Sequence, residues 1–183
     1  MTVLMEKAQV DEIPLFRRKA PLQRAVQLLK RHRDQMYKGD EDRKPISIII
    51  TTLAARAYNG EQDIESALAS ILSKMESLVN PDAPRVPNPV NPAEDFADRW
   101  PMPQHKYLQL EENFFLWLRA AKADFSNLLS SDDASFITEL AMDKFAARVN
   151  EADLRSRLGL LATTSVHTPT QHVAQAPSKP WSI

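Results

Sequence analysis

A run of four basic side chains, Lys30, Arg31, His32 and Arg33, is the first feature of this sequence that could do chemistry. The run closes an amphipathic segment that begins at Pro21, a residue suited to the first turn of a helix. At the helical period, one broad face of the segment collects Leu22, Ala25, Val26, Leu28 and Leu29. On the same wheel Arg31 faces solvent, whereas Arg33 falls within the apolar face. Cations grouped in this way can bind phosphate through charge-assisted hydrogen bonds.

Two interpretations of this basic run remain open. Cations in the last turn of a helix interact favourably with its dipole, and a guanidinium on the burying face would pair with a carboxylate, because an unpaired buried charge is costly. Alternatively, the apolar stripe docks on a neighbouring domain and the cations face a shared cleft that holds phosphates. The first interpretation gives Lys30 and Arg31 equal importance, whereas the second favours Lys30.

The other polar clusters predict neither a metal site nor a catalytic residue. The acidic turn at 40–42 has no framing strand and is interpreted as a solvated loop rather than a magnesium site. The four histidines lack metal-ligand spacing, and the chain has no cysteine. The three glycines, Gly39, Gly60 and Gly159, each follow a predicted helix, so no glycine-rich phosphate loop is available. No nucleophile with a base and an orienting group can be assembled.

Composition predicts a soluble, cytoplasmic, globular chain. Of its 183 residues, 43% are hydrophobic and 26% are charged, and the net charge is -1. No overall field therefore draws the chain to nucleic acid or to an anionic membrane. No run approaches the roughly 18 apolar residues of a membrane span, so no membrane partner is expected.

The hydrophobic periodicity predicts an all-α fold of five or six helices. The chain divides into three segments. Residues 1–20 form a lead-in segment, extended around 12–16; residues 21–160 form the helical domain; residues 161–183 form a flexible, disordered tail, polar from about Ala162. The apolar pattern of residues 45–59 predicts a helix buried on all sides, although the β-branched residues in this segment would also suit a strand. The clearest helix begins at Glu61 and ends before Asn80.

The remaining predicted elements follow a proline-rich stretch at 80–103. This stretch should be a packed loop, because Phe96 and Trp100 are four residues apart, with a short helical turn at 93–100. A long helix is predicted over 104–129. Asp132 or Asp133 should cap the next helix, and Asn150 should cap a last short one.

Three blocks of sequence, in this order, resemble the C-terminal half of a bacterial cGAS/DncV-like nucleotidyltransferase (CD-NTase): PLQRAVQLLKRHRD, KPISIIITTLAARAY and VPNPVNPAEDFADRW. The same trio is more faintly similar to the C-terminal helical domain of the oligoadenylate synthetases. Enzymes of this family make cyclic or linear oligonucleotide signals in CBASS anti-phage defence. The resemblance therefore implies ATP- or GTP-type nucleoside triphosphates and magnesium as cofactors of an intact enzyme.

The resemblance also implies three nucleotide-binding residues. Lys30 matches the helix lysine that contacts nucleotide phosphates, and Ser47 matches an early position of the apolar helix that contacts the nucleotide. Asn91 lies in the loop that flanks the donor pocket in the family. No family role transfers to Arg33.

The family's catalytic residues are missing from this sequence. Those enzymes hold two magnesium ions with a pair of carboxylates and a third acidic residue on strands that follow a Gly-Ser motif. No Gly-Ser pair occurs here, and the acidic turn at 40–42 lies on the wrong side of the first helix. We therefore expect a nucleotide-binding helical lobe without its catalytic half, inactive alone, completed in cis or in trans, and prone to self-association. The alternative is a helical protein–protein interaction module with no nucleotide role.

Overall fold

The computed structural model describes residues 20–159. Within this range, all the regular secondary-structure elements are helices. The elements in chain order are α1 (Pro21–Met36), α2 (Ser47–Ala57), α3 (Ile64–Lys74), η1 (Glu76–Leu78), η2 (Pro103–Leu108), α4 (Leu110–Ser130), α5 (Ala134–Phe145) and α6 (Glu151–Arg157). The predicted all-α fold is confirmed. The predicted lead-in at 1–20, apart from its last residue, and the predicted tail at 161–183 lie outside the described residues.

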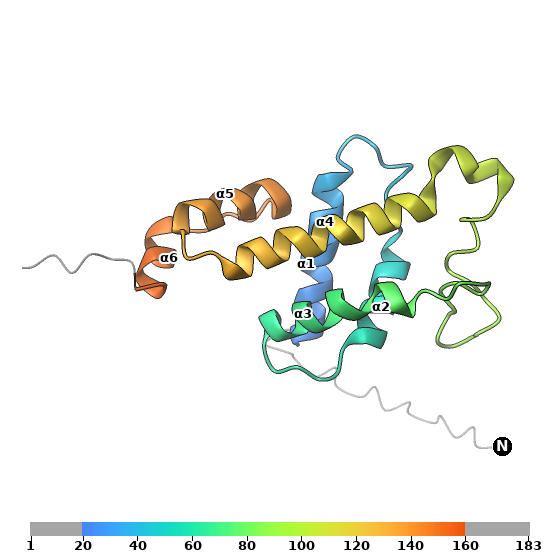
Figure 1. Ribbon diagram of the computed structural model, residues 1–183, viewed down its shortest axis with the longest axis horizontal. Helices are drawn as coiled ribbons and strands as arrows, with labels where there is room; N and C mark the ends of the chain where they lie inside the picture. The colour runs from blue at the N-terminus through green and yellow to red at the C-terminus, as the bar shows by residue number, and fades with distance from the viewer. Residues whose placement is uncertain (1–19, 160–183) are drawn as a thin grey trace, which may run out of the picture.

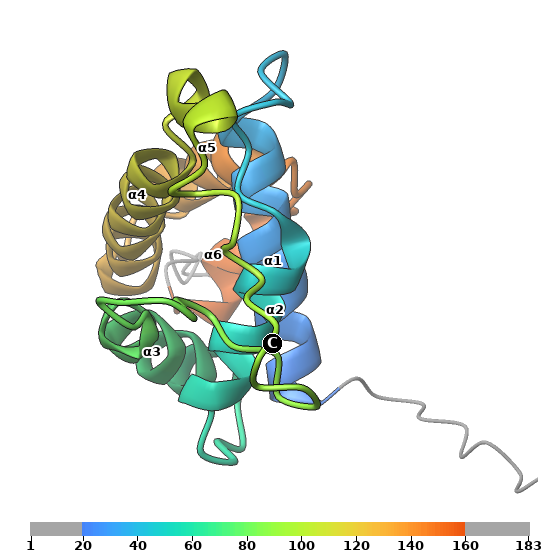
Figure 2. The ribbon, with the colours of Figure 1, turned by 90° about the vertical axis from the view of Figure 1, so that its right-hand side faces the viewer.

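The helices pack around α1, which contacts α2, α3, α4 and α5 (Figure 1). Helix α4 follows the long axis of the molecule, with α5 and α6 at one end and the 80–108 segment at the other. A view from that second end shows α4 and α3 on one side and α1 and α2 on the other (Figure 2). The core between them includes the fully buried side chains of Leu29, Ile50, Ile71, Phe114 and Trp117.

Local sequence signals set most helix ends. Asp63, Asp133 and Asn150 each accept hydrogen bonds from backbone N–H groups in the first turn of α3, α5 and α6 respectively. Gly39 and Gly60, which follow α1 and α2, have φ angles of 88° and 87°, a region that residues with a Cβ atom rarely adopt. The predicted caps at Asp133 and Asn150 and the predicted stops at Gly39 and Gly60 are confirmed. The helix predicted to begin at Glu61 and to end before Asn80 is shorter: Asp63 caps it so that α3 begins at Ile64, and it ends at Lys74, before the separate 3-10 helix η1.

Helix α2 is not buried on all sides, which corrects the prediction. Its inner face is buried through Ile49, Ile50 and Leu53, but Ile48 and the preceding Ile46 are each 44% exposed. Helices α1 and α3 contact α2 but leave these two isoleucines partly exposed. Two exposed isoleucines therefore flank Ser47 at the N-terminal end of α2.

The proline-rich stretch is packed as predicted, and where a short helical turn was predicted at 93–100 the chain forms hydrogen-bonded turns at 96–100 without a regular helix. Val86 is fully buried, and Phe96 and Trp100 pack against the core. The Asp95 carboxylate accepts hydrogen bonds from the backbone N–H groups of Arg85, Val86 and Ala97. This competition for backbone groups explains why the chain turns here instead of continuing as a helix.

The predicted helix over 104–129 is divided in two. Gln109 has a φ angle of 49°, which ends the 3-10 helix η2 and starts α4 one residue later. The face of α4 that points to the core carries Phe114, Trp117, Leu118 and Phe125, all of which are buried.

Candidate functional site

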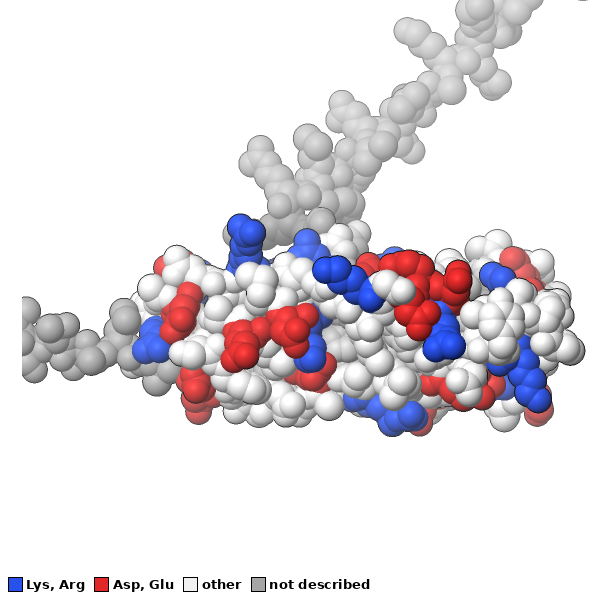
Figure 3. Space-filling view, turned by 90° about the horizontal axis from the view of Figure 1, so that it is seen from above, with Lys and Arg blue, Asp and Glu red and all other residues white. Residues whose placement is uncertain are grey.

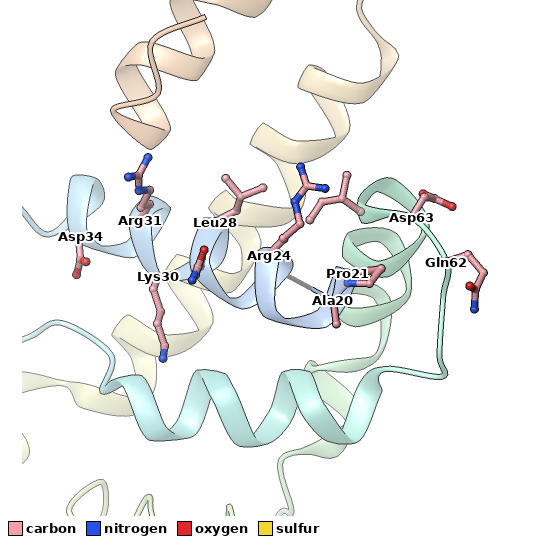
Figure 4. A pocket seen from close by; sticks show the side chains of 11 residues that line it. Ala20, Pro21, Arg24, Leu28, Lys30, Arg31, Asp34, Gln62 and Asp63 are labelled. Atoms are coloured by element: carbon pink, nitrogen blue, oxygen red, sulfur yellow. The ribbon is translucent and has the colours of Figure 1, made fainter. Parts of the chain in front are cut away.

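A broad depression of about 1220 Å³ lies along the outer face of α1 and extends to the α2–α3 loop (Figure 4). Lys30 lies at one edge of it, and its side chain extends from α1 toward α2. Arg24 and Arg31 lie at the other edge and extend away from α2. Of the three predicted nucleotide-binding residues, Lys30 lines this depression, whereas Ser47 and Asn91 do not.

The three basic residues of this depression form no ion pairs within the described part of the chain, and of its two acidic residues only Asp34 forms one. Arg24, Lys30 and Arg31 form no ion pair among residues 20–159. Asp34 is engaged by Arg33 and Lys44, and Asp63 accepts the first-turn N–H of Ser66 in α3. The depression therefore offers uncompensated positive charge.

Arg33 is buried, as its place on the apolar face of α1 predicted, with 5% of its surface exposed. Its Nε and Nη2 atoms donate to the Asp34 carboxylate at 3.0 and 2.7 Å, which confirms the predicted carboxylate partner. Its Nη1 atom donates to the Pro45 carbonyl oxygen at 2.9 Å and to Ser47 Oγ at 2.8 Å. Arg33 thus fixes the segment that leads into α2.

The charges around Asp34 support this arrangement. Desolvation acts to raise the pKa of Asp34, but the hydrogen bonds and charges of Arg33 and Lys44 outweigh it, so the pKa lies below the usual value for aspartate. Asp34 therefore remains a carboxylate that holds the Arg33 guanidinium in place at neutral pH.

Ser47 is the first residue of α2 and is exposed. The helix has Ile46 at its N-cap, and within residues 20–159 no side chain accepts a hydrogen bond from the backbone N–H groups of its first turn. Because the Ser47 oxygen already accepts from Arg33, its hydroxyl proton is available to a further acceptor. Free N–H groups, a hydroxyl donor and the positive end of the helix dipole together favour an anion at this end of α2.

Asn91 occupies an exposed position in the proline-rich loop, where its carbonyl oxygen accepts the backbone N–H of Glu94 at 2.9 Å. Within residues 20–159, no hydrogen bond or ion pair joins this turn to α1 or to the start of α2. The structure therefore connects Lys30 with Ser47, because Arg33, on the same helix as Lys30, donates to Ser47 at the start of α2. It does not connect Asn91 with either residue, so the nucleotide contact of Asn91 stays a prediction.

His32 is also buried, with 2% of its surface exposed, and its Nε2 atom lies 3.0 Å from an Asp124 carboxylate oxygen of α4. The ring lies among Phe125 and Phe145, at centroid distances of 6.2 and 5.4 Å. Burial lowers the pKa of His32, and the Asp124 hydrogen bond offsets this shift only in part. His32 therefore joins α1 to α4 and α5 as a structural residue.

The described residues do not fit a magnesium site, because no group of three His, Cys, Asp or Glu side chains within 20–159 could hold a metal ion. Acidic and basic side chains alternate over the face in Figure 3, without a field of one sign. Within the same range, no helix combines the length and the apolar character needed to cross a bilayer.

Comparison with known proteins adds one relative. No family model matches the chain. The chain is 40% identical over 104 residues to a protein of Roseivirga ehrenbergii named c-di-GMP synthase. The match covers 55% of this chain and 27% of the relative, so the chain spans about a quarter of the relative's length. At a coarse level, the sequence is thus similar to a cyclic dinucleotide synthase, a nucleotidyltransferase-related protein.

Proposed function

We propose that this chain is the nucleotide-binding helical lobe of a nucleotidyltransferase that makes cyclic oligonucleotide second messengers. The similarity to a c-di-GMP synthase supports the class of reaction. The observation that carries the proposal is the uncapped start of α2, where buried Arg33 holds Ser47 and toward which Lys30 extends. A role in CBASS anti-phage defence, in the cytoplasm, follows from the sequence resemblance and is part of the same proposal.

In this proposal each residue has a distinct task. Lys30 contributes a positive charge to the phosphates of a nucleoside triphosphate, and the Ser47 hydroxyl donates a hydrogen bond to a phosphate oxygen. Arg33 is a positioning residue, because its donors are used by Asp34, Pro45 and Ser47. Asn91 would contact the nucleotide from the proline-rich loop. A catalytic half, in cis or in trans, would supply the magnesium-binding carboxylates, since the described residues do not.

Binding of inorganic tripolyphosphate to the full chain tests this assignment without requiring catalysis. Lys30→Ala should weaken binding by roughly 10- to 150-fold, because charge-assisted hydrogen bonds contribute about 1.5–3 kcal/mol. Arg31→Ala is the matched control on the same helix, since its side chain extends away from α2. It should change the affinity less than about 3-fold, as expected for an exposed charge. Equal losses in the two variants would refute the assignment.

A second function has support from the two exposed isoleucines at the start of α2. Ile46 and Ile48 are each 44% exposed, which would suit a helical interaction module that binds a protein partner or a second copy of the chain. Tight binding of a partner protein, together with no measurable binding of tripolyphosphate, ATP or GTP, would favour this function over the first.

A further inference from the structure

A second depression, of about 300 Å³, lies between the α1–α2 loop, the start of α2 and the segment that leads into α4. Its lining combines aromatic, basic and acidic side chains with an apolar floor that includes Ile49 and Leu108, both buried. None of Lys30, Ser47 and Asn91 lines it. Its volume is at the lower end of the range for small-molecule pockets and suits a ligand of the size of a nucleobase.

The basic residues that line this depression include Arg99 and His105. Arg99 Nε donates to His105 Nε2 at 3.3 Å, which orients the guanidinium. The two terminal nitrogens of Arg99 have no hydrogen-bond or ion-pair partner among residues 20–159. The fork of Arg99 therefore remains available to two acceptor atoms of a ligand.

The acidic side contains one engaged and one free carboxylate. Glu41 forms an ion pair with Lys44, which Asp34 also contacts. Asp42 lines the same depression, and within the described residues it has neither a hydrogen-bond nor an ion-pair partner. A free carboxylate accepts two parallel N–H bonds, so Asp42 is suited to a ligand that presents two adjacent donors.

The aromatic side contains one ring that is free to stack. Trp100 packs against Phe114 at a centroid distance of 5.4 Å, and the Arg85 guanidinium lies 5.6 Å from its ring centroid. Tyr107, in contrast, is 72% exposed and lies in no ring pair of the described chain. An exposed tyrosine ring at the mouth of a pocket is suited to stack on a planar ligand.

We propose that this second depression binds the guanine base of a guanosine phosphate, an inference that rests on the proposed function and names its substrate class. Guanine presents two adjacent donors, N1–H and the 2-amino group, to Asp42. It presents two acceptors, O6 and N7, which the Arg99 fork can reach in the bidentate manner that arginine uses on this base. Tyr107 stacks on the plane of the base. Adenine lacks the N1–H donor and has an amino group in place of O6, so it matches neither side.

Titration of the full chain with guanosine, inosine and adenosine 5′-monophosphates, followed by amide NMR, tests the inference. GMP should shift the resonances of residues 96–110 in a saturable way. IMP lacks the 2-amino group and should bind about 3- to 10-fold more weakly than GMP, and AMP more weakly still. Equal affinity for GMP and AMP, shifts confined to α1, or no saturable shift with GMP would overturn the proposal.

Four variants separate the roles in the pocket. Asp42→Asn should reduce GMP affinity about 10-fold and abolish the preference over IMP. Tyr107→Ala should also reduce it about 10-fold, whereas Tyr107→Phe should retain the wild-type affinity because the ring remains. Arg148→Ala, which removes an exposed arginine outside this depression, is the control and should have no effect. Wild-type GMP affinity in Asp42→Asn would refute the guanine assignment.

The outcome is distinguishable from that of the proposed phosphate site. Lys30→Ala should leave the GMP-induced shifts of residues 96–110 unchanged, because Lys30 does not line this depression. Inorganic tripolyphosphate carries no base and should shift resonances of α1 and the start of α2 instead. Loss of GMP binding in Lys30→Ala would show that a single site, and not the second depression, accounts for the binding.

Discussion

Replacing Arg33 by methionine should destabilise the fold strongly, although Arg33 belongs to the basic run that first suggested ligand binding. Arg33 is 5% exposed and donates four hydrogen bonds, two to Asp34 and one each to Pro45 and Ser47. Methionine has a similar length and no donor. The variant would therefore keep much of the packing and remove all four hydrogen bonds.

The magnitude depends on which partners are buried. The Pro45 carbonyl lies in a buried residue, and leaving such a group unpaired costs about 1–3 kcal/mol. The bonds to Asp34 count for less, because its side chain is 51% exposed and water can replace the guanidinium. Removing the buried charge also removes its desolvation cost, which offsets part of the loss. We expect a net decrease of about 1–3 kcal/mol in the free energy of unfolding.

Urea unfolding followed by far-ultraviolet circular dichroism measures this decrease. Arg31→Ala is the matched control, since Arg31 is exposed and has no ion pair in the described chain; it should change the free energy of unfolding by less than about 0.5 kcal/mol. Arg33→Lys should be intermediate, because lysine keeps the charge but loses the planar fork. A loss below about 0.5 kcal/mol in Arg33→Met would refute the view that Arg33 joins α1 to the start of α2.

Two further substitutions test the packing of α1 and the end of α5. Burial lowers the pKa of His32 in the folded chain, so as the pH falls the unfolded chain binds a proton at this residue first. The free energy of unfolding should therefore decrease as the pH drops below about 6.5. In urea titrations, His32→Gln should flatten this pH dependence. A wild-type pH dependence in that variant would exclude His32 as the cause. Ala146 has a φ angle of 46°, a left-handed conformation that glycine adopts at lower cost than alanine. Ala146→Gly should therefore stabilise the fold by about 0.5–1 kcal/mol and raise the thermal midpoint. An unchanged midpoint would contradict this.

The helices could be predicted because their signals are local. In α1 the apolar residues recur at the helical period after Pro21, and in α5 and α6 the caps Asp133 and Asn150 stand next to the first turn they serve. The proline-rich loop could be predicted to pack because it contains Phe96 and Trp100, which no solvated linker needs. Each of these inferences used residues a few positions apart.

The site could be predicted only in part, because its key contacts join distant residues. The position of Arg33 on the apolar face predicted a buried guanidinium paired with a carboxylate. No pattern in the sequence indicated that the guanidinium would also donate to Ser47, 14 residues away. The His32–Asp124 contact spans 92 residues. The left-handed conformation of Gln109, which divides the predicted helix over 104–129, has no local signal because a residue other than glycine adopts it.

The start of α2 joins the two proposed functions. Ile46 and Ile48 are half-exposed on either side of Ser47, so a protein surface that covered these isoleucines would also exclude water from the uncapped N-terminus. A lower local dielectric strengthens the attraction between Lys30, the helix dipole and a phosphate. Partner binding and phosphate binding would then reinforce each other by linkage instead of being alternatives. On this reasoning, we propose that a catalytic half or a second copy that closed over α2 would strengthen phosphate binding at the proposed site.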